Sequence, residues 1–252
     1  MLDVVTTSAR ANPALRERAA ALASRFGWRV VAPQDAPADC VVVTRVGLRL
    51  RVGGRDHRWH PGMLHALEDA GSKHPIIRMT GLKPGDTVID CTLGLGTEAA
   101  FCAGWTGVEV LAFESVPAIA IWAQEGLAGR GVRVRIGDAL DGLAAMADRC
   151  ADVVMADPLF EVGGAGHGLA AVRAAGERGL DAERWLTQAL RVARRAVLLK
   201  DGVTEGDGLL ERLGAPAVAA RRGRRARWGC WRLDADGETG GSSAVARSAG
   251  TT

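Results

Sequence analysis

The sequence predicts an α/β protein with a doubly wound, largely parallel sheet, preceded by a small α/β segment. Three observations support this fold class. From Asp86 onward, short apolar runs alternate with helix-length segments, the first of these runs leads into a glycine-rich turn, and residues 1–60 hold a helix and strands of their own. With 252 residues the chain can bury a full-sized core. We divide it into a small segment (1–60), a main domain (61–233) and a tail (234–252).

The first sixty residues contain a predicted amphipathic helix over 13–26. Its apolar residues recur at helical spacing, Asn12 is a suitable N-cap, and Pro13 fits the first turn. Short apolar runs around it predict strands at Val4-Val5, 40–44 and 47–52. Gly53-Gly54 predicts a turn after the last of them. These elements form the small α/β segment.

The main domain follows a strand–helix rhythm. Its predicted strands are 87–90, 108–113, 132–136, 151–155 and 196–199, and its predicted helices are 98–105, 117–127, 140–147 and 181–194. Because crossovers between parallel strands are right-handed almost without exception, we expect a ligand crevice at the carboxyl ends of the strands. After Asp234 the chain is rich in Gly, Ser, Ala and Thr, so the tail is predicted to be disordered.

Composition limits the class of protein. The chain is 48% hydrophobic and 24% charged with a net charge of +3, which is typical of a soluble globular protein. It has no apolar run near the ~20 residues that cross a bilayer and no secretory signal, so we expect a cytoplasmic protein. Five widely spaced cysteines without a C-x-x-C pair predict reduced thiols, with neither disulfides nor a zinc knuckle.

The most informative motif lies after the first strand of the main domain. The strand ends at Asp90 and runs into Gly94-Leu95-Gly96 and then a helix, an arrangement that lets the backbone approach a ligand closely. Glu114 stands twenty residues after Gly94, at the predicted end of the next strand, where an acid can accept both hydroxyls of a ribose. The motif therefore predicts an adenosine-type cofactor.

Two cofactors fit this loop, because 94–99 also satisfies the nicotinamide pattern G-x-G-x-x-G/A. Asp138 follows the third strand and can accept from the exocyclic amine of an adenine. Asp157-Pro158-Leu159-Phe160 follows the fourth strand, where a carboxylate can hold a substrate amine while an aromatic ring stacks on its base. Attack on a methylsulfonium needs mainly alignment, so this turn favours methyl transfer over hydride transfer.

With these motifs, the sequence resembles the class I S-adenosylmethionine (SAM)-dependent methyltransferases. Among them it is most similar to the small-subunit (16S) ribosomal RNA guanine-N2 methyltransferases of the J family and to related uncharacterised bacterial methyltransferases. The resemblance covers about the central half of the chain, from His60-Pro61-Gly62-Met63 through 81–86 and the glycine loop to 157–160 and Leu180-Asp181-Ala182. It implies N-methylation of an exocyclic amine of guanine in RNA. The site residues it implies are, for SAM, Asp90, Gly94, Gly96, Thr97, Glu98, Glu114, Ser115, Asp138 and Ala139, and, for methyl transfer, Asp157, Pro158 and Phe160.

Other functions remain open from the residues alone. An NAD(P)-dependent oxidoreductase could use the same glycine loop and Glu114. A catalytically silent accessory protein that binds SAM or RNA is a further alternative, because Thr97-Glu98 stands where the J family tends to carry Arg-Asp and the loop 161–168 has few basic residues. A serine hydrolase is set aside, since the chain lacks a G-x-S-x-G elbow.

A basic segment near the C-terminus is the candidate RNA contact. Trp228 and Trp231 can stack on splayed bases, and the arginines can neutralise phosphates. These arginines are Arg221, Arg222, Arg224, Arg225 and Arg227. The alternative is a solvated β-hairpin tip with both tryptophans packed against a helix.

Histidines and a lysine complete the candidate residues. His57, His60 and His65 lack the spacing and partners of a metal site, so no metal is predicted. We expect His60 and His65 to line the crevice instead. Lys200, at a strand end, is either a phosphate contact or a surface charge.

Overall fold

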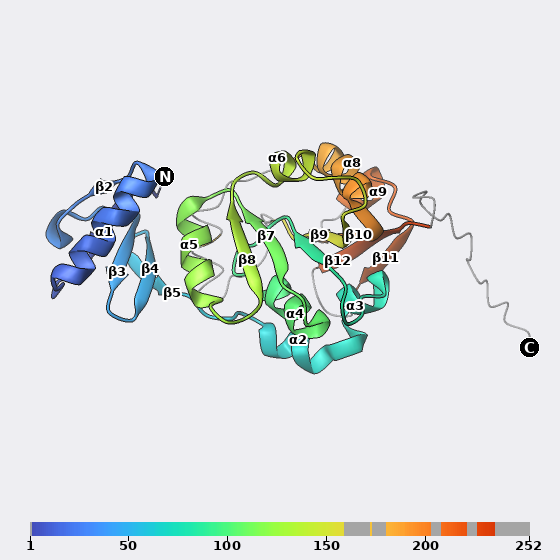
Figure 1. The fold of residues 1–252 in the computed structure, drawn as a ribbon, viewed down its shortest axis with the longest axis horizontal. Coiled ribbons are helices and arrows are strands. Elements are labelled where there is room, and N and C mark those ends of the chain that lie inside the picture. Colours follow the sequence, from blue (N-terminus) through green and yellow to red (C-terminus); the bar gives the residue numbers. More distant parts are fainter. Residues whose placement is uncertain (1, 159–171, 173–179, 203–207, 221–225, 235–252) are drawn as a thin grey trace, which may run out of the picture.

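The structure is a computed structural model that describes residues 2–158, 172, 180–202, 208–220 and 226–234. These residues form two sheets. The first has five strands in the order β2-β1-β3-β4-β5, and the second has seven in the order β11-β12-β10-β9-β6-β7-β8. Figure 1 shows the first sheet at one end of the molecule beside α5, and β11 and β12 at the other end. The fold class predicted from the sequence is confirmed.

The small sheet combines parallel and antiparallel pairs. Its strands are β1 (Val4–Thr7), β2 (Arg29–Val30), β3 (Cys40–Thr44), β4 (Gly47–Val52) and β5 (Arg55–Arg58). β1 pairs in parallel with β2 and β3, whereas β3, β4 and β5 form antiparallel hairpins. Helix α1 (Pro13–Phe26) begins as predicted, because the Asn12 side chain accepts a hydrogen bond from the N–H of Leu15 at 3.0 Å.

The connection between the sheets contains two short helices that the sequence analysis did not predict. They are α2 (Leu64–Ala70) and α3 (Pro75–Thr80). His74 caps α3 by accepting from the N–H of Ile76 at 3.3 Å, and Pro75 occupies the first turn. Just before them, the indole N–H of Trp59 donates to the carbonyl of Leu95 in the glycine loop at 3.0 Å. The connection is thus attached directly to that loop.

The large sheet has five parallel strands and an antiparallel edge. The parallel strands are β6 (Val88–Asp90), β7 (Val110–Glu114), β8 (Val132–Ile136), β9 (Ala151–Ala156) and β10 (Ala193–Gly202). β12 (Ala226–Arg232) runs antiparallel between β10 and β11 (Ala217–Ala220). All five predicted strands are present, and the expected antiparallel last pair is observed, with 221–225 outside the described residues.

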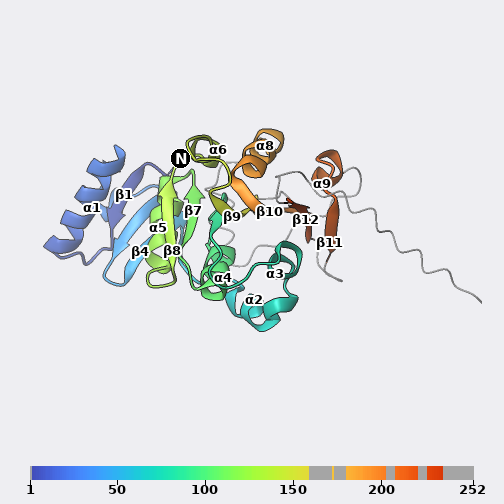
Figure 2. The same ribbon diagram turned by 45° about the vertical axis from the view of Figure 1, so that its right-hand side comes forward.

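Helices cover both faces of this sheet (Figures 1 and 2). Helices α4 (Thr97–Thr106) and α5 (Pro117–Gly126) pack with α2 and α3 on one face, and α6 (Ala139–Ala144), α8 (Ala182–Val192) and α9 (Leu209–Arg212) on the other. Helix α5 also contacts β4, and its Trp122 is fully buried between the two sheets. The doubly wound arrangement is therefore complete.

One helix ends earlier than predicted. The sequence suggested a helix to residue 194, but α8 ends at Val192 and β10 begins at Ala193. Arg194 and Arg195 lie in the strand and pair with Asp152 and Asp86. These pairs lie at the amino ends of the parallel strands, opposite the crevice.

The chain order places the crevice between two adjacent central strands. From β6 the chain continues to β7 and β8 on one side, and it then crosses back to β9 and β10 on the other. Strand order therefore reverses between β6 and β9, and ligands of doubly wound sheets bind at the carboxyl ends of such a pair.

Candidate active site at the carboxyl edge of the large sheet

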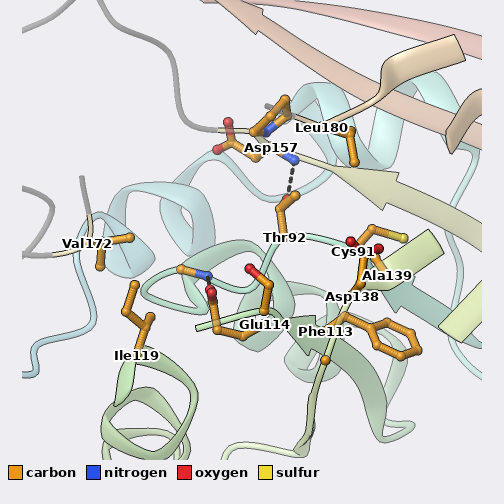
Figure 3. A pocket seen from close by; sticks show the side chains of 14 residues that line it. Cys91, Thr92, Phe113, Glu114, Ile119, Asp138, Ala139, Asp157, Val172 and Leu180 are labelled. Atoms are coloured by element: carbon orange, nitrogen blue, oxygen red, sulfur yellow. Dashed lines mark hydrogen bonds between the residues drawn. The ribbon is translucent and has the colours of Figure 1, made fainter. Parts of the chain in front are cut away.

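A cavity opens where the loops after β6, β7, β8 and β9 meet. It is lined from these loops by Cys91, Thr92 and Gly94, by Glu114 and Ser115, by Gly137, Asp138 and Ala139, and by Asp157 and Pro158. Figure 3 shows Asp157 and Glu114 on opposite sides of Thr92 in that view. Four loops far apart in the chain thus meet around one cavity, as expected at a switch point.

The glycine loop has a backbone that side chains would disturb. Asp90 accepts from the N–H of Thr92 at 2.9 Å, which turns the chain away from β6. Gly94 has φ +51° and lines the cavity, and Gly96 has φ +72°. A Cβ on Gly96 would lie 2.4 Å from Leu127 Cδ1, so Gly96 serves close packing as well as the turn.

Glu114 is held in place by two backbone donors. Its Oε2 accepts from the N–H of Gly94 at 3.1 Å, and its Oε1 accepts from the N–H of Val116 at 3.0 Å. An ionised carboxylate has about four lone-pair positions, so it can accept more than these two bonds. The carboxylate therefore presents a fixed pair of acceptors at the cavity.

Asp138 and a set of apolar side chains form the far side. Asp138 caps α6 by accepting from the N–H of Leu140 at 2.6 Å. Phe113 and Ile119 line the cavity with Val172 and Leu180, as Figure 3 shows. This part of the cavity suits a flat apolar group with one polar edge.

Asp157 stands at the end of β9 in a charged group. Its N–H donates to Thr92 Oγ1 at 2.6 Å, and its carboxylate pairs with the ammonium of Lys200 from β10. Lys200 Nζ also lies 3.4 Å from Glu98 Oε1, on the first turn of α4. Strand end, helix start and neighbouring strand thus bring two acids and one base together.

Burial sets the protonation of these acids. Burial, reinforced by the negative charge of Glu98, raises the pKa of Asp157 to about 7, although Lys200 opposes the shift. Burial likewise raises the pKa of Asp90 to about 7 against the N–H of Thr92. Despite its burial, Glu98 has a lowered pKa because Lys200 is adjacent. Asp157 therefore changes charge near neutral pH.

Comparison with known proteins identifies the fold. No protein-family model matches the chain. A SAM-dependent methyltransferase from Neisseria gonorrhoeae superposes with a TM-score of 0.63 at 21% identity, covering 91% of this chain and 95% of that one. The large sheet has the Rossmann-like methyltransferase fold.

One curated relative is similar in sequence. YpiP of Bacillus subtilis, whose own function is uncharacterised, is 35% identical over 147 residues, or 52% of this chain. The match spans 57% of the length of YpiP. Since no family model matches, membership of the ribosomal RNA guanine-N2 J family stays a prediction.

Within this methyltransferase fold, the predicted site residues divide into two sets. The residues that line the cavity are Gly94, Glu114, Ser115, Asp138, Ala139, Asp157 and Pro158. Those outside its lining are Asp90, Gly96, Thr97 and Glu98. Thr97 donates its hydroxyl to the carbonyl of Pro61 at 3.2 Å, and Glu98 faces Lys200. Phe160 lies outside the described residues.

Several residues that line the cavity were not among the predicted site residues, including Thr92, Cys91 and Ile119. Thr92 positions the backbone of Asp157, Cys91 contributes a buried thiol, and Ile119 contributes apolar surface from α5. Thr92 follows the strand end by two residues, which is a usable signal, whereas nothing local to Ile119 indicates its place. The pairing of Lys200 with Asp157 joins positions 43 residues apart, and spacing alone does not indicate it.

The basic segment differs from the prediction in its described part. Trp228 and Trp231 are buried at 6% and 3% exposure on opposite faces of the sheet, so neither can stack on a base. The stacking interpretation is wrong, and the alternative, in which both tryptophans pack inside the protein, is the one observed. Arg227 pairs with Asp201 and Glu211 inside the protein. The other four arginines of the segment, at positions 221, 222, 224 and 225, lie outside the described residues.

The histidines do not gather at the cavity. His60 accepts from the N–H of Gly62 at 3.0 Å and His65 pairs with Glu68, and neither lines the cavity as far as the described residues show. Within the same residues, no group of three or more metal-ligating side chains lies together. The described helices include none long and apolar enough to span a membrane.

Proposed function

We propose that this chain is a SAM-dependent methyltransferase that methylates an exocyclic amine of guanine in RNA. One observation carries the proposal. Gly94 and Glu114, suited to an adenosine cofactor, line the same cavity as Asp157 and Pro158, suited to a substrate amine. A cofactor site and an acidic turn on separate edges of the sheet would have argued against methyl transfer.

The cavity residues fit the cofactor. The two acceptors of Glu114, fixed by backbone N–H groups, match the two hydroxyls of a ribose. Phe113, Ile119 and Leu180 offer apolar surface for an adenine, with Asp138 at its polar edge. In this fit Glu114 and Ser115 hold the ribose, and the glycine loop faces the methionine part.

The reaction needs little from the protein beyond alignment and one acceptor. The cofactor, held by Glu114, Ser115 and the glycine loop, would supply a methyl group on a sulfonium; its carbon–sulfur bond would break, with the electron pair going to sulfur, as the amine nitrogen bonded to the carbon. Asp157 accepts a hydrogen bond from the amine and then the proton that the nitrogen releases. Thr92 fixes the backbone from which Asp157 acts.

RNA as the substrate rests on sequence features. Four motifs in order resemble the guanine-N2 methyltransferases, and five arginines are concentrated in 221–227. The neighbour from Neisseria gonorrhoeae is a SAM-dependent methyltransferase, which supports SAM as the cofactor of this chain and leaves the choice of substrate to the sequence motifs. Guanine in ribosomal RNA is accordingly the first substrate to test.

Calorimetry is the first test of the cofactor. We expect saturable binding of S-adenosylhomocysteine and none of NADH to the full chain. Binding of NADH alone would indicate an oxidoreductase that uses the same glycine loop.

Label transfer is the test of the substrate. The protein is incubated with tritiated SAM and unmethylated ribosomal RNA, and the nucleosides are separated by mass spectrometry. We expect label in N2-methylguanosine. Cofactor binding without label in any RNA would indicate an accessory protein instead of an enzyme.

A further inference from the structure

Lys200 lies at the centre of the charged group beside the cavity. Its ammonium pairs with Asp157 from β9 and lies 3.4 Å from Glu98 of α4. It also stands over the ring of Trp228 from β12, 5.2 Å from the ring centroid. The side chains of Lys200, Glu98 and Asp157 are only 22%, 21% and 24% exposed. A surface charge or a free phosphate contact would not be enclosed by three elements in this way.

The local charge balance makes this lysine necessary. Three acids lie close together: Asp90 at the end of β6, Glu98 at the start of α4 and Asp157 at the end of β9. Lys200 is the cation that the described residues place among them. Carboxylates that share a partly buried site cannot all ionise without a counter-charge, because like charges repel strongly at low dielectric.

We propose that Lys200 is a positioning residue for methyl transfer: it favours the ionised form of Asp157 and fixes the Asp157 carboxylate beside the cavity. This inference rests on the proposed function and adds a residue to it. Lys200 acts through Asp157, so it needs no contact with the substrate or the cofactor.

The proton balance of the reaction explains why the charge of Asp157 matters. The amine nitrogen forms one bond to carbon and must lose one proton. An ionised Asp157 takes that proton and becomes a neutral acid, which later returns it to water. A protonated Asp157 cannot accept a second proton, so the reaction then lacks its proton acceptor.

The neighbours of Asp157 act on it in opposite directions. Burial raises the pKa of Asp157 to about 7, Lys200 lowers it, and Glu98 raises it. Removing the cation should therefore move the pKa up, and removing the charge of Glu98 should move it down. An opposite charge at this range is worth about 1–3 pKa units.

The first experiment compares pH–rate profiles of four variants with the wild type. Lys200→Met keeps the aliphatic stem and removes the charge, Lys200→Arg restores a cation, Glu98→Gln removes the competing acid, and Lys73→Met is the matched control at an exposed position. We expect the acid limb of kcat to move up by about 1–3 pH units in Lys200→Met and down in Glu98→Gln. At pH 7 the Lys200→Met rate should fall about fivefold or more and recover at high pH.

Two outcomes would overturn the proposal. One is a Lys200→Met rate that falls equally at every pH, since a structural role lowers the amount of competent enzyme without moving a titration. The other is a loss that Lys200→Arg does not rescue. Lys73→Met should match the wild type throughout.

The second experiment does not require methyl transfer. Selective ¹³C labelling of aspartate carboxyls, with Asp157→Asn to assign the resonance, follows the titration of Asp157 directly. We expect its midpoint near 7 in the wild type, higher in Lys200→Met and lower in Glu98→Gln, and an unchanged midpoint in Lys200→Met overturns the proposal. If no RNA accepts label from the wild type while these shifts occur, the proposed function fails and the role of Lys200 in controlling Asp157 stands.

Discussion

The two sides of the cavity are held by different kinds of bond. On the glycine side (Gly94, Glu114 and Asp138), carboxylates accept from backbone N–H groups at 2.6–3.1 Å. On the aspartate side (Asp157, Glu98 and Lys200), charged side chains hold one another. Backbone donors do not titrate, whereas the charge of Asp157 changes near neutral pH. Cofactor affinity should therefore vary less with pH than the rate of methyl transfer.

Asp157→Ala gives the largest effect expected from this difference. Loss of the proton acceptor should lower kcat about 10²–10⁴-fold, the usual contribution of general base catalysis. Affinity for S-adenosylhomocysteine should change less than about threefold, because the glycine side is built without Asp157. Label transfer and calorimetry measure the two quantities. Asp157→Asn is the isosteric control, and an equal loss of binding and turnover would show that the two sides are not independent.

Gly96→Ala tests the packing within the glycine side. The new Cβ meets Leu127 at 2.4 Å and the residue must keep φ +72°, so we expect a loss of about 2–4 kcal/mol in the free energy of unfolding. Gly94→Ala is the matched control. Its Cβ finds no atom closer than 3.7 Å, and its positive φ alone should cost about 1–2 kcal/mol. Urea unfolding measures both, and equal losses would contradict the assignment of Gly96 to packing.

Glu114→Ala tests the ligand acceptors of the glycine side. We expect binding of S-adenosylhomocysteine to weaken by about 1.5–3 kcal/mol, the scale of hydrogen bonds to a charged group. Asp141→Ala, at an exposed acid on α6, is the control and should bind like the wild type. Calorimetry checks both variants. Undiminished binding in Glu114→Ala would place the ribose elsewhere.

Arg194→Met should give the smallest effect, at the opposite edge of the sheet. Against the effect of burial, Arg194 and Thr87 hold the pKa of Asp152 below its usual value. This lowered pKa stabilises the fold above the unfolded pKa near 4, and the contribution is lost as pH falls below it. Because the Arg194 side chain is 43% exposed, we expect a loss of about 0.5 kcal/mol at pH 7. Urea unfolding at pH 7 and pH 3 should show the difference shrink at pH 3.

The parts of the fold that local patterns govern were predictable. The helix over 13–26 has its boundaries in the sequence, because a capping Asn12 and a first-turn Pro13 specify the start. The strand 132–136 was also placed correctly. Helices α2 and α3 were missed because each has fewer than eight residues, too few to establish a periodicity. The His74-Pro75 pair was the available cap signal for α3.

The site was predictable only where strand ends mark it. Glu114 and Asp157 follow buried strands, and parallel strands bring their ends together, so one edge of the sheet could be expected to hold both. The environment of each carboxyl could not be predicted in this way. For Trp228 the sequence left stacking on RNA and packing against a helix both open, and alternation along β12 turns the side chain into the core. Lys200 acquires its partners only through tertiary contact.

The indole of Trp59 has a consequence for the molecule as a whole. It lies flat enough on α5 that a Cβ at Gly126 would come within 2.0 Å of its ring, while its N–H reaches the carbonyl of Leu95. Any force that pulls the small sheet away must therefore withdraw this ring and loosen the turn that precedes α4. The N-terminal sheet therefore supports the glycine loop. We expect ligand binding at the cavity to increase the resistance of the first third of the chain to unfolding by force, and loss of the ligand to decrease it.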